Sequence, residues 1–522
     1  GTRSEDEARE KAAGWLATDH VPGSFDRRPL HWPLVFPEVF ERGGFDAIIG
    51  NPPFLGGQKI TGALGTAYRE HLVHALGRGA RGSADLVAYF VLRAHELLNQ
   101  HGQTGLIATN TLAQGDTREV GLDQVVASGV TIRQAIKSEP WPSKSAALEY
   151  CAIWTSRSAL SDKAERRADG VVASGITSSL DPEARVTGKP QRLAANVGIA
   201  FQGSTILGLG FTMDPAEADA LIDKDARNKD ILFPYLNGQD LNNRPDCSAS
   251  RWVINFHDWS EDRAKSYPEC YERVLRLVKP EREKNSRKVY RDYWWQYAEK
   301  RPALLKAMAG LERVIVIARV SKTVMPAMVP SGQVFNEKIV VFVTDDTAML
   351  AFLSSAVHYW WVATYSSTLK ADINYAPSDA FETLPLAELT DDIRELGDRL
   401  DTYRRHVMLR RQTGLTATYN LVFDPSCQDE DIVELRRIHR AIDEAVCRAY
   451  GWDDLVEQGL DHGFHKAGAY IRYTVGPAVK QEILDRLLEL NHERYAAEVA
   501  AGLHDKGAKK RGAKTSTQGS LF

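Results

Sequence analysis

The stretch at residues 45–54, FDAIIGNPPF, constrains the fold more than any other part of the sequence. Its first six residues are a short apolar run of the kind that forms a buried β-strand. Asn51 and two prolines then end the strand, because proline has a fixed φ and no backbone N–H for a neighbouring strand. Polar residues directly after such a strand are typical of α/β folds, in which ligands bind at the carboxyl ends of parallel strands.

The next segments continue an α/β pattern. Residues 84–100 carry apolar side chains at helical spacing, and residues 104–109 form another short apolar strand. The order strand, helix, strand predicts a parallel sheet. Residues 117–128 predict a further helix and residues 147–156 a further strand of that sheet, whereas residues 157–190 have the Ser, Asp and Gly content of a linker or mobile loop.

A chain of 522 residues is too long for one hydrophobic core, so several domains are expected. We expect the first domain at residues 1–190. Residues 191–388 mix short strands with basic and aromatic stretches, which predicts an α+β domain. Residues 389–503 repeat apolar residues at helical spacing and predict amphipathic helices packed on the body. Residues 504–522 are polar and basic and predict a disordered tail.

Composition narrows the class of protein. No apolar run approaches the roughly 20 residues that span a bilayer, and the N-terminus lacks a signal peptide, so we expect a cytoplasmic protein without membrane contact. The five cysteines lie far apart, with no zinc-ligand spacing, so neither a metal site nor disulfides are expected. The net charge of -4 gives no global basic signal, so a nucleic-acid site has to come from local clustering.

The tetrapeptide Asn51–Phe54 suits one particular chemistry. An exocyclic base amine such as that of adenine is a poor nucleophile because its lone pair is delocalised, so a catalyst must favour the tetrahedral form of the transition state. The Asn51 oxygen and the Pro52 carbonyl could each accept one N–H of that amine, and proline holds its carbonyl in place. Phe54 offers a flat face for a base rotated out of the duplex. The alternative is a plain turn that ends the strand.

At this point the sequence resembles a known family. FDAIIGNPPF looks like the catalytic motif of the gamma-class, Taq-type amino-methyltransferases, and residues 31–57 are similar to the large Mme-type restriction-modification enzymes. Later segments match in the same order and extend the resemblance over nearly the whole chain: GLIATN (105–110), PWPSKSAALEYCAIW (140–154), WWQYAEKRPAL (294–304), FNEKIVVF (335–342) and SSTLKADINYAPSDAFETLPL (366–386).

The resemblance implies a fold and an activity. The fold is α/β: a partial Rossmann-like methyltransferase sheet, then an α+β target-recognition domain and C-terminal helices. The activity is site-specific adenine-N6 methylation of double-stranded DNA by base flipping, with S-adenosyl-L-methionine as methyl donor, in a restriction-modification or phage-defence system. Asn51 and Pro52 would bind the target amine and Phe54 would stack on the base. The alternative is a DNA-binding specificity module, or truncated subunit of such a system, without activity of its own.

The family's Gly-rich cofactor turn should precede the catalytic motif by roughly 60 to 100 residues, but the residues before Asn51 contain no such turn. We therefore expect the C-terminal part of a longer enzyme, whose partners are an N-terminal cofactor-binding or nuclease portion or other defence-system subunits. Asp46 is a candidate cofactor-binding residue, with a solvated strand start as the alternative. Trp141 either faces the flipped base or packs under the sheet.

A local basic patch lies within this acidic chain. Between Arg263 and Lys322 there are 16 Lys or Arg residues against 7 Asp or Glu, a local net charge of +9. Basic and aromatic residues alternate there, which predicts phosphate contacts and salt-dependent DNA binding. The predicted phosphate-contacting residues are Arg282, Lys284, Arg287, Lys288 and Arg291. The alternative is a solvated amphipathic helix with buried aromatic side chains.

Sequence-specific reading requires side chains on base edges rather than on phosphates. We expect it from two loops, Arg319 to Lys322 and Lys370 to Tyr375, with Arg319, Lys322 and Lys370 as the candidate residues. The sequence that these loops read does not follow from the residues.

Overall fold

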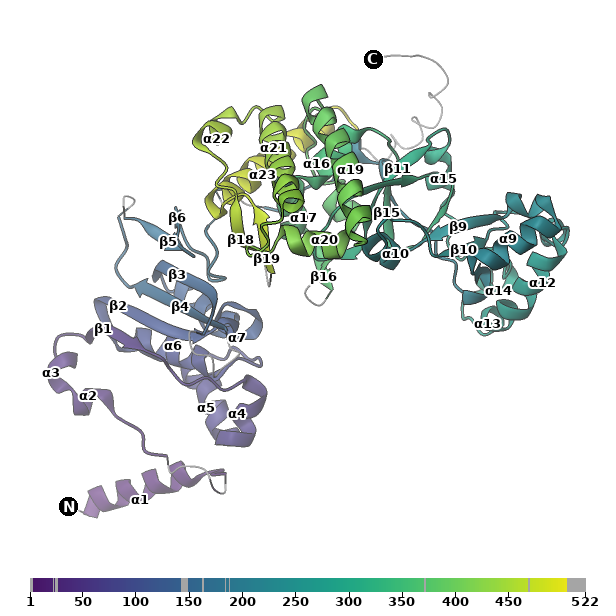
Figure 1. Ribbon diagram of the computed structural model, residues 1–522. Coiled ribbons are helices and arrows are strands. Elements are labelled where there is room, and N and C mark those ends of the chain that lie inside the picture. Colours follow the sequence, from purple (N-terminus) through teal and green to yellow (C-terminus); the bar gives the residue numbers. More distant parts are fainter. Residues whose placement is uncertain are drawn as a thin grey trace. The chain divides into compact units, whose positions relative to one another are not determined.

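The computed structural model describes residues 3–504 except positions 22, 24–26, 142–148, 162–163, 184, 187, 370–371 and 468–469. The chain forms two compact units, Gly1–Arg185 and Val186–Phe522 (Figure 1). The division lies beside the boundary expected at residue 190. The predicted disordered tail lies outside the described residues, apart from residue 504.

The first unit is built on a mixed six-stranded sheet with the strand order β1-β2-β4-β3-β5-β6. β1 and β2 are parallel, and β4 runs antiparallel between β2 and β3. β4 reverses because its connection to β3 is too short for the crossover of a parallel pair. The carboxyl ends of β1, β2 and β3 therefore meet the amino end of β4 at one edge. The bounds are β1 Phe45–Gly50, β2 Leu98–Thr109, β3 Thr131–Pro140, β4 Glu149–Ser156, β5 Arg166–Ala168 and β6 Val171–Ala173.

Helices cover this sheet. The buried face of α6 includes Val87 and Val91, which share a core with Leu106 and Ile153 of the strands. β5 and β6 lie in the segment expected to be a linker, since three-residue strands are too short to show an alternating pattern. The helical segments are α1 Arg3–Ala17, α2 Trp32–Val35, α3 Pro37–Phe40, α4 Gly57–Leu64, α5 Thr66–His71, η1 Leu72–Leu76, α6 Leu86–Leu97, η2 Asn110–Ala113, α7 Gly115–Val120 and α8 Leu122–Ala127.

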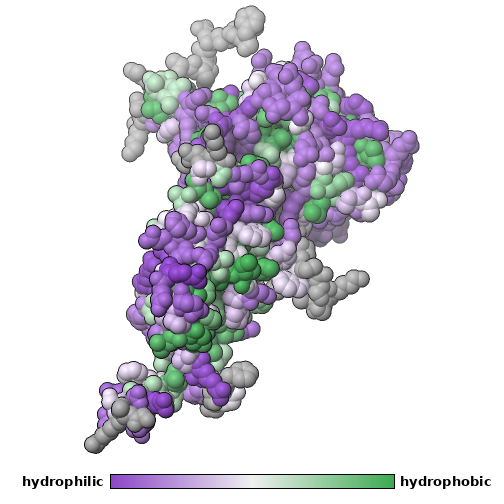
Figure 2. Space-filling model, turned by 90° about the vertical axis from the view of Figure 1, so that its left-hand side faces the viewer, coloured by the Kyte–Doolittle hydropathy of each residue, from purple (hydrophilic) through white to green (hydrophobic). Residues whose placement is uncertain are grey.

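β1 is the edge strand of this sheet, and part of its surface is apolar. Ile49 is 85% exposed, and Leu34 of α2 is 78% exposed. α2 is joined to the start of β1 by an edge-to-face contact between Trp32 and Phe45 with ring centroids 5.7 Å apart. Figure 2 shows hydrophobic patches on the otherwise hydrophilic surface of the first unit.

The second unit contains a small lobe with its own core. A four-stranded sheet, ordered β14-β9-β10-β8, packs with short helices around Phe211, Phe256, Val274 and Trp294. The bounds are η4 Leu209–Phe211, β8 Thr212–Met213, α9 Pro215–Lys224, η5 Ala226–Asp230, β9 Leu232–Leu236, β10 Arg251–Ile254, α11 Glu261–Lys265, α12 Pro268–Leu277, α13 Lys279–Glu283, α14 Lys288–Asp292 and β14 Val334–Phe335.

The body of the second unit joins a sheet, ordered β13-β11-β15-β7, to the C-terminal helices. One core contains both Val316 of β11 and Ile438 of α21, so the expected regions 191–388 and 389–503 share it. The bounds are η3 Ala194–Asn196, β7 Ala200–Gln202, α10 Gly238–Asn243, α15 Pro302–Met308, β11 Arg313–Ala318, β13 Ala327–Pro330, β15 Ile339–Phe342, α16 Thr347–Ser354, α17 Ala356–Tyr365, α18 Pro377–Ala380, α19 Asp391–Arg411, α20 Leu415–Val422, α21 Glu430–Ala449, α22 Asp453–Gln458 and α23 Pro477–Ala500.

Two small sheets complete this unit. β12 Val320–Ser321, β17 Asp372–Asn374 and β16 Ser367–Leu369 form one, and the hairpin β18 Gly463–Ala467 with β19 Tyr470–Thr474 forms the other. The hairpin interrupts the region predicted to be helical. Within the described residues, no helix is both long and apolar enough to cross a membrane.

Candidate active site and nucleic-acid interface

The Asn51–Phe54 loop leaves the sheet at the carboxyl end of β1. Gly50, the last residue of β1, pairs with Leu106 of the parallel neighbour β2. Asn51 is exposed, Pro52 is half-buried and Phe54 is 43% exposed. The groups predicted to contact a base are therefore accessible at the edge where parallel sheets bind ligands.

Asp85, the N-cap of α6, fixes the end of this loop. Its Oδ1 accepts the backbone N–H of Leu55 and that of Val87, both at 3.0 Å. The carbonyl of Leu55 in turn accepts the N–H of Leu86 at 3.0 Å. Asp85 is itself positioned by Thr117, whose Oγ1 accepts its backbone N–H at 3.1 Å. The loop is thus bonded to the first turn of a buried helix.

A close backbone contact holds the loop further along. A Cβ at Gly57 would lie 2.3 Å from the carbonyl carbon and oxygen of Ser83, so only glycine fits there. The N–H of Ser83 donates to Asp116 Oδ2 at 2.5 Å. These contacts preorganise the loop, which is what stabilisation by fixed hydrogen-bond acceptors requires.

A second polar cluster lies at the same edge of the sheet. Asn110, directly after β2, donates to Ser138 Oγ at 3.2 Å and to Glu149 Oε2 at 3.0 Å, and Ser138 also donates to Glu149. Trp141 contacts Tyr150 edge-to-face with ring centroids 5.6 Å apart. The sequence analysis did not predict Asp85 as an anchor of the loop, and it did not predict this cluster. The available signal for the cluster was the pair Thr109–Asn110 at the end of the strand.

The open side of β1 does not fit a site for S-adenosyl-L-methionine. The carboxylate of Asp46 accepts from Asn99 Nδ2 at 2.6 Å and so links β1 to β2. Ile49 presents an exposed apolar side chain instead of hydrogen-bond donors. The described residues along β1 therefore provide a strand edge and no cradle for the ribose, carboxylate or amine of that molecule.

The lobe of the second unit carries exposed cations where α13 ends and α14 begins. Lys284, Arg287 and Lys288 are exposed, and none has a carboxylate within ion-pair distance in the described part of the chain. Arg287 donates to the Tyr290 hydroxyl at 2.7 Å. Arg291 donates to the carbonyls of the connection between the helices, at 2.6 Å for Asn285.

Arg282 lies inside the lobe, so the expected phosphate contact does not fit this residue. Its side chain is 1% exposed and donates to the carbonyls of Leu207 and Ile206 at 2.7 Å and of Gln296 at 3.1 Å. Burial lowers the pKa of its guanidinium. The side chains of Trp294 and Trp295 are also buried, but both residues lie in the turn after α14 and not on an amphipathic helix.

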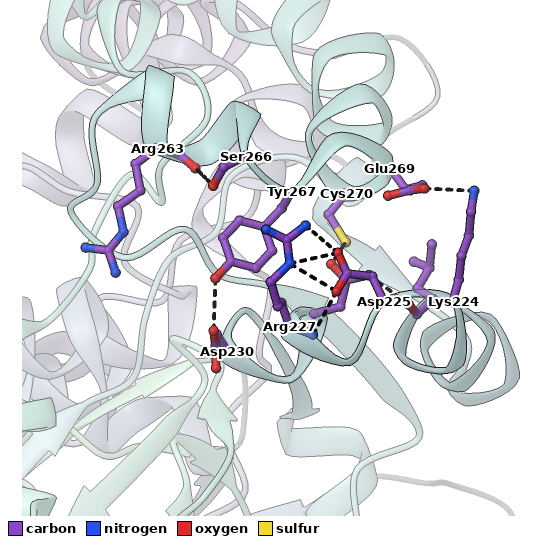
Figure 3. A network of polar contacts seen from close by, with 11 residues as sticks. Lys224, Asp225, Arg227, Asp230, Arg263, Ser266, Tyr267, Glu269 and Cys270 are labelled. Atoms are coloured by element: carbon purple, nitrogen blue, oxygen red, sulfur yellow. Dashed lines mark hydrogen bonds and ion pairs between the residues drawn. The ribbon is translucent and has the colours of Figure 1, made fainter.

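Charged residues elsewhere on the lobe are paired with one another (Figure 3). Arg227 forms a two-pronged contact with Asp225, with 2.6 Å between Nη2 and Oδ2. Lys224 contacts Glu269 at 2.7 Å. The Arg263 guanidinium instead lies 3.7 Å from the ring centre of Trp259. Most charges on this face are therefore neutralised by neighbouring charges, whereas Lys284, Arg287 and Lys288 have no such partner among the described residues.

The two segments expected to read bases are neighbouring strands. In the pairing of β12 with β17, Val320 lies opposite Asn374, and Arg319 Nε donates to Asn374 Oδ1 at 3.2 Å. The carbonyl of Arg319 accepts the N–H of Tyr375 at 2.7 Å. Lys322 lies with its Nζ 5.4 Å from the ring centre of Tyr470. Lys370 lies outside the described residues.

Sequence reasoning missed a polar pocket beside these strands, which we call the amide pocket. It has a volume of about 560 Å³. Gln239, Asn242 and Asn243 of α10 have no side-chain hydrogen bond in the described part of the chain and face it. The lining residues are Asn237, Gly238, Gln239, Asn242, Asn243, Ala318, Val320, Asn336, Glu337, Lys338 and Thr416. Four separate segments build it, so no local pattern indicates it.

These features fit a class of protein in which a methylase segment is followed by a target-recognition domain, as in restriction-modification proteins. Residues 21–138 match the family of the Eco57I restriction-modification methylase, and residues 184–388 match the target recognition domain of MmeI. The chain therefore joins an Eco57I-type methylase segment to an MmeI-type target recognition domain. This agrees with the resemblance seen in the sequence.

Relatives of the chain are distant. DNA methyltransferase A of Bacillus subtilis (strain 168) is 20% identical over 417 residues, which are 77% of this chain and 45% of that protein. The chain thus spans less than half of that relative. Among solved structures, the type IIL restriction-modification enzyme MmeI in complex with DNA is 15% identical with a TM-score of 0.47, covering 90% of this chain and 59% of that one. The type IIG restriction endonuclease BpuSI is 12% identical with a TM-score of 0.35, covering 78% and 54%.

Proposed function

We propose that the chain supplies the target-base site and the DNA-recognition surface of a site-specific DNA adenine-N6 methyltransferase, in a restriction-modification or phage-defence system. The observation that carries this proposal is the Asn51–Phe54 loop, which leaves the carboxyl end of β1 and is fixed by Asp85. Two accessible acceptors next to an exposed aromatic ring match the needs of an amine on an extruded base.

The residues of the loop act on the base and its amine. Phe54 stacks on the adenine after it rotates out of the duplex. Asn51 Oδ1 and the Pro52 carbonyl each accept one amine N–H, which favours the tetrahedral nitrogen and directs its lone pair outward. Asp85 keeps both acceptors in place through Leu55. S-adenosyl-L-methionine supplies the methyl group when bound by the complete enzyme.

The methyl donor's site is completed along β1 by further strands of a cofactor-binding portion. The exposed Ile49 on the edge strand supports this, because open apolar edges are places where another strand is added. Asp46 remains a candidate for the border of that site, although its contact with Asn99 gives it a role within the sheet.

DNA recognition is divided between two surfaces of the second unit. Lys284, Arg287 and Lys288 neutralise phosphates, with Arg291 supporting their connection. Arg319, Lys322 and Lys370 read base edges together with the amide pocket. The Asn and Gln side chains of the amide pocket are suited to reading adenine, because each can form hydrogen bonds with both N6 and N7 of that base.

Two measurements test the proposal. Calorimetry of S-adenosyl-L-methionine with the chain, with and without duplex DNA, shows whether these residues complete a cofactor site. Mass spectrometry of nucleosides from DNA treated with the chain, alone and together with a cofactor-binding portion, identifies the methylated base. We expect 6-methyladenine, lost in Asn51→Ala with DNA binding kept.

Different outcomes overturn different parts of the proposal. Methylated cytosine would refute the adenine assignment. Tight cofactor binding by the chain alone would refute the completion along β1. Salt-sensitive DNA binding without methylation in any combination would identify the chain as a specificity module.

A further inference from the structure

A second pocket lies between α20 and the hairpin β18–β19, and we call it the Arg472 pocket. Its volume is about 210 Å³. Tyr470 and Ile471 of the hairpin are 37% and 48% exposed at its side, and Asn420 of α20 is exposed at its rim. Lys322, one of the expected base-reading residues, also lines it. Neither matched family segment includes the hairpin.

Arg472 gives this pocket a buried positive charge. Its side chain is 5% exposed, and its guanidinium lies 3.6 Å from the ring centre of Tyr359 and 4.5 Å from that of Phe423. Nη1 donates to the Thr323 carbonyl at 2.9 Å. No carboxylate of the described residues lies within ion-pair distance of it. A buried cation that has ring contacts but no carboxylate in direct contact favours the approach of an anion.

The nearby carboxylates are engaged elsewhere. Asp424, which also lines the pocket, accepts the N–H of Ser426 at 2.8 Å and its hydroxyl at 2.7 Å. Asp443 accepts the N–H of Ala356 at 2.6 Å and contacts His462 at 3.0 Å. The charged side chains that line the pocket are Lys322, Arg472 and Asp424, so positive charge is in excess.

The Arg472 pocket continues the amide pocket. Thr416 lines the amide pocket and Asn420 the Arg472 pocket, and these residues are one turn apart on the same face of α20, about 6 Å along the axis. Val320 lines the amide pocket, and Lys322, two residues further along the chain, lines the Arg472 pocket.

The hairpin is bonded to both expected base-reading segments. Arg472 contacts Thr323, next to Lys322, and the Tyr470 hydroxyl donates to Asp372 of β17 at 3.4 Å. β18 and β19 lie beside α20 and β16 in Figure 1. An anion in the Arg472 pocket would therefore lie next to β12 and the two residues that flank it, Arg319 and Lys322.

We propose that the Arg472 pocket binds a backbone phosphate of DNA, next to the base edges read at the amide pocket. The inference rests on the proposed DNA-binding function and extends the interface to the C-terminal helical region. Arg472 supplies a planar pair of donors that matches phosphate oxygens, and Lys322 supplies a second charge at the rim. The stacked rings of Tyr359 and Phe423 hold the guanidinium in one orientation.

The test is DNA binding by the full chain with Asn420→Asp, measured by fluorescence anisotropy over a series of salt concentrations. The substitution places a negative charge at the rim of the pocket on an exposed helical position, so the fold is kept. We expect affinity at low salt to fall at least several-fold and the salt slope to decrease by about 0.9, the value for one phosphate contact. Gln458→Glu, at an exposed position of α22, makes the same charge change away from the pocket and should have neither effect.

A second variant and a second probe complete the test. Arg472→Met keeps approximately the length of the side chain and removes its charge. If circular dichroism shows that this variant is folded, it should show the same decrease in the salt slope of DNA binding. Calorimetric titration with inorganic phosphate distinguishes binding of a free anion from binding of DNA. If Asn420→Asp changes phosphate binding but not DNA binding, the pocket binds a free anion and the proposal is overturned. Equal behaviour of Asn420→Asp and Gln458→Glu on DNA would also overturn it. An unaltered chain that does not bind DNA would refute both this inference and the proposed function.

Discussion

Asp85 accepts the backbone N–H of Leu55 at 3.0 Å, across thirty positions of sequence, and thereby joins the Asn51–Phe54 loop to the first turn of α6. The same oxygen caps that helix through Val87. One carboxylate oxygen thus determines where the loop ends and where the helix begins. The position of Asn51 and Pro52 depends on this contact, because only a few residues separate them from Leu55.

The first prediction concerns Asp85→Ala. Loss of the cap should cost about 0.5–2 kcal/mol of unfolding free energy, and release of Leu55 should let the loop move. We therefore expect weaker capture of an extruded base, measured by the fluorescence of 2-aminopurine at the target position, with unchanged total DNA affinity. Asp19→Ala is the matched control, because Asp19 accepts backbone N–H groups at the start of α5, including that of Ala67 at 3.0 Å. Equal loss of base capture in both variants would contradict the role of Asp85.

The second prediction concerns Ile49→Glu at the open edge of β1. Ile49 is 85% exposed, so the substitution should leave the melting temperature of the chain nearly unchanged. It should prevent a cofactor-binding portion from pairing with β1, because a charged side chain on an edge opposes strand addition. Co-purification of the two portions measures this. Val172→Glu, at another exposed apolar position of the same sheet, should leave association intact. Association that survives Ile49→Glu would place the partner elsewhere.

Local patterns in the sequence were sufficient to predict those parts of the fold that depend on residues close together in the chain. β1 follows the apolar run 45–50, and the Asn51 loop follows from the prolines that end it. The two segments expected to read bases also lie together, since Val320 of β12 lies opposite Asn374 of β17. The sequence predicted a shared role for the two segments, because both carry residues suited to base reading, but it did not predict that they pair.

The sequence could not predict contacts that depend on distant segments. Arg282 belongs to a basic stretch, but carbonyls of Ile206 and Leu207 surround its guanidinium after folding, so a residue with the composition of a phosphate contact is buried. The hairpin β18–β19 lies among helices, and its short strands give no clear period. Arg472 is buried by Tyr359 and Phe423, which come from different helical segments.

The third prediction separates the exposed cations of the lobe from the buried one. Lys288→Gln and Lys284→Gln should each weaken binding to all duplexes equally and reduce the salt slope by about 0.9, as expected for a phosphate contact. Arg282→Gln should instead lower the unfolding free energy, because it leaves the carbonyls of Leu207 and Ile206 without their donor. Anisotropy at several salt concentrations and urea unfolding measure the two effects. If Arg282→Gln is as stable as the unaltered chain but changes the salt slope of DNA binding, Arg282 contacts a phosphate and the prediction is wrong.

The fourth prediction concerns pH and two buried histidines of the second unit. Burial lowers the pKa of His358 to about 4 and that of His439 to about 3, so both are neutral in the folded chain at neutral pH. Nδ1 of His358 lies 2.7 Å from the Leu353 carbonyl and Nε2 lies 2.9 Å from the Tyr375 hydroxyl, a geometry that uses one donor and one acceptor of the neutral ring.

Protonation therefore favours the unfolded chain. Below its ordinary pKa of about 6.5 an unfolded histidine binds a proton that the folded chain does not, so stability is fully present above that pH and decreases as pH falls toward 4. Each histidine should contribute a slope of about 1.4 kcal/mol per pH unit in that window. Urea unfolding followed by tryptophan fluorescence at pH 7.5, 6 and 5 measures this slope. His439→Gln should reduce it, whereas His406→Gln, at an exposed position of α19, should leave it unchanged. An equal slope in all three proteins would show that these histidines do not cause the loss of stability in acid.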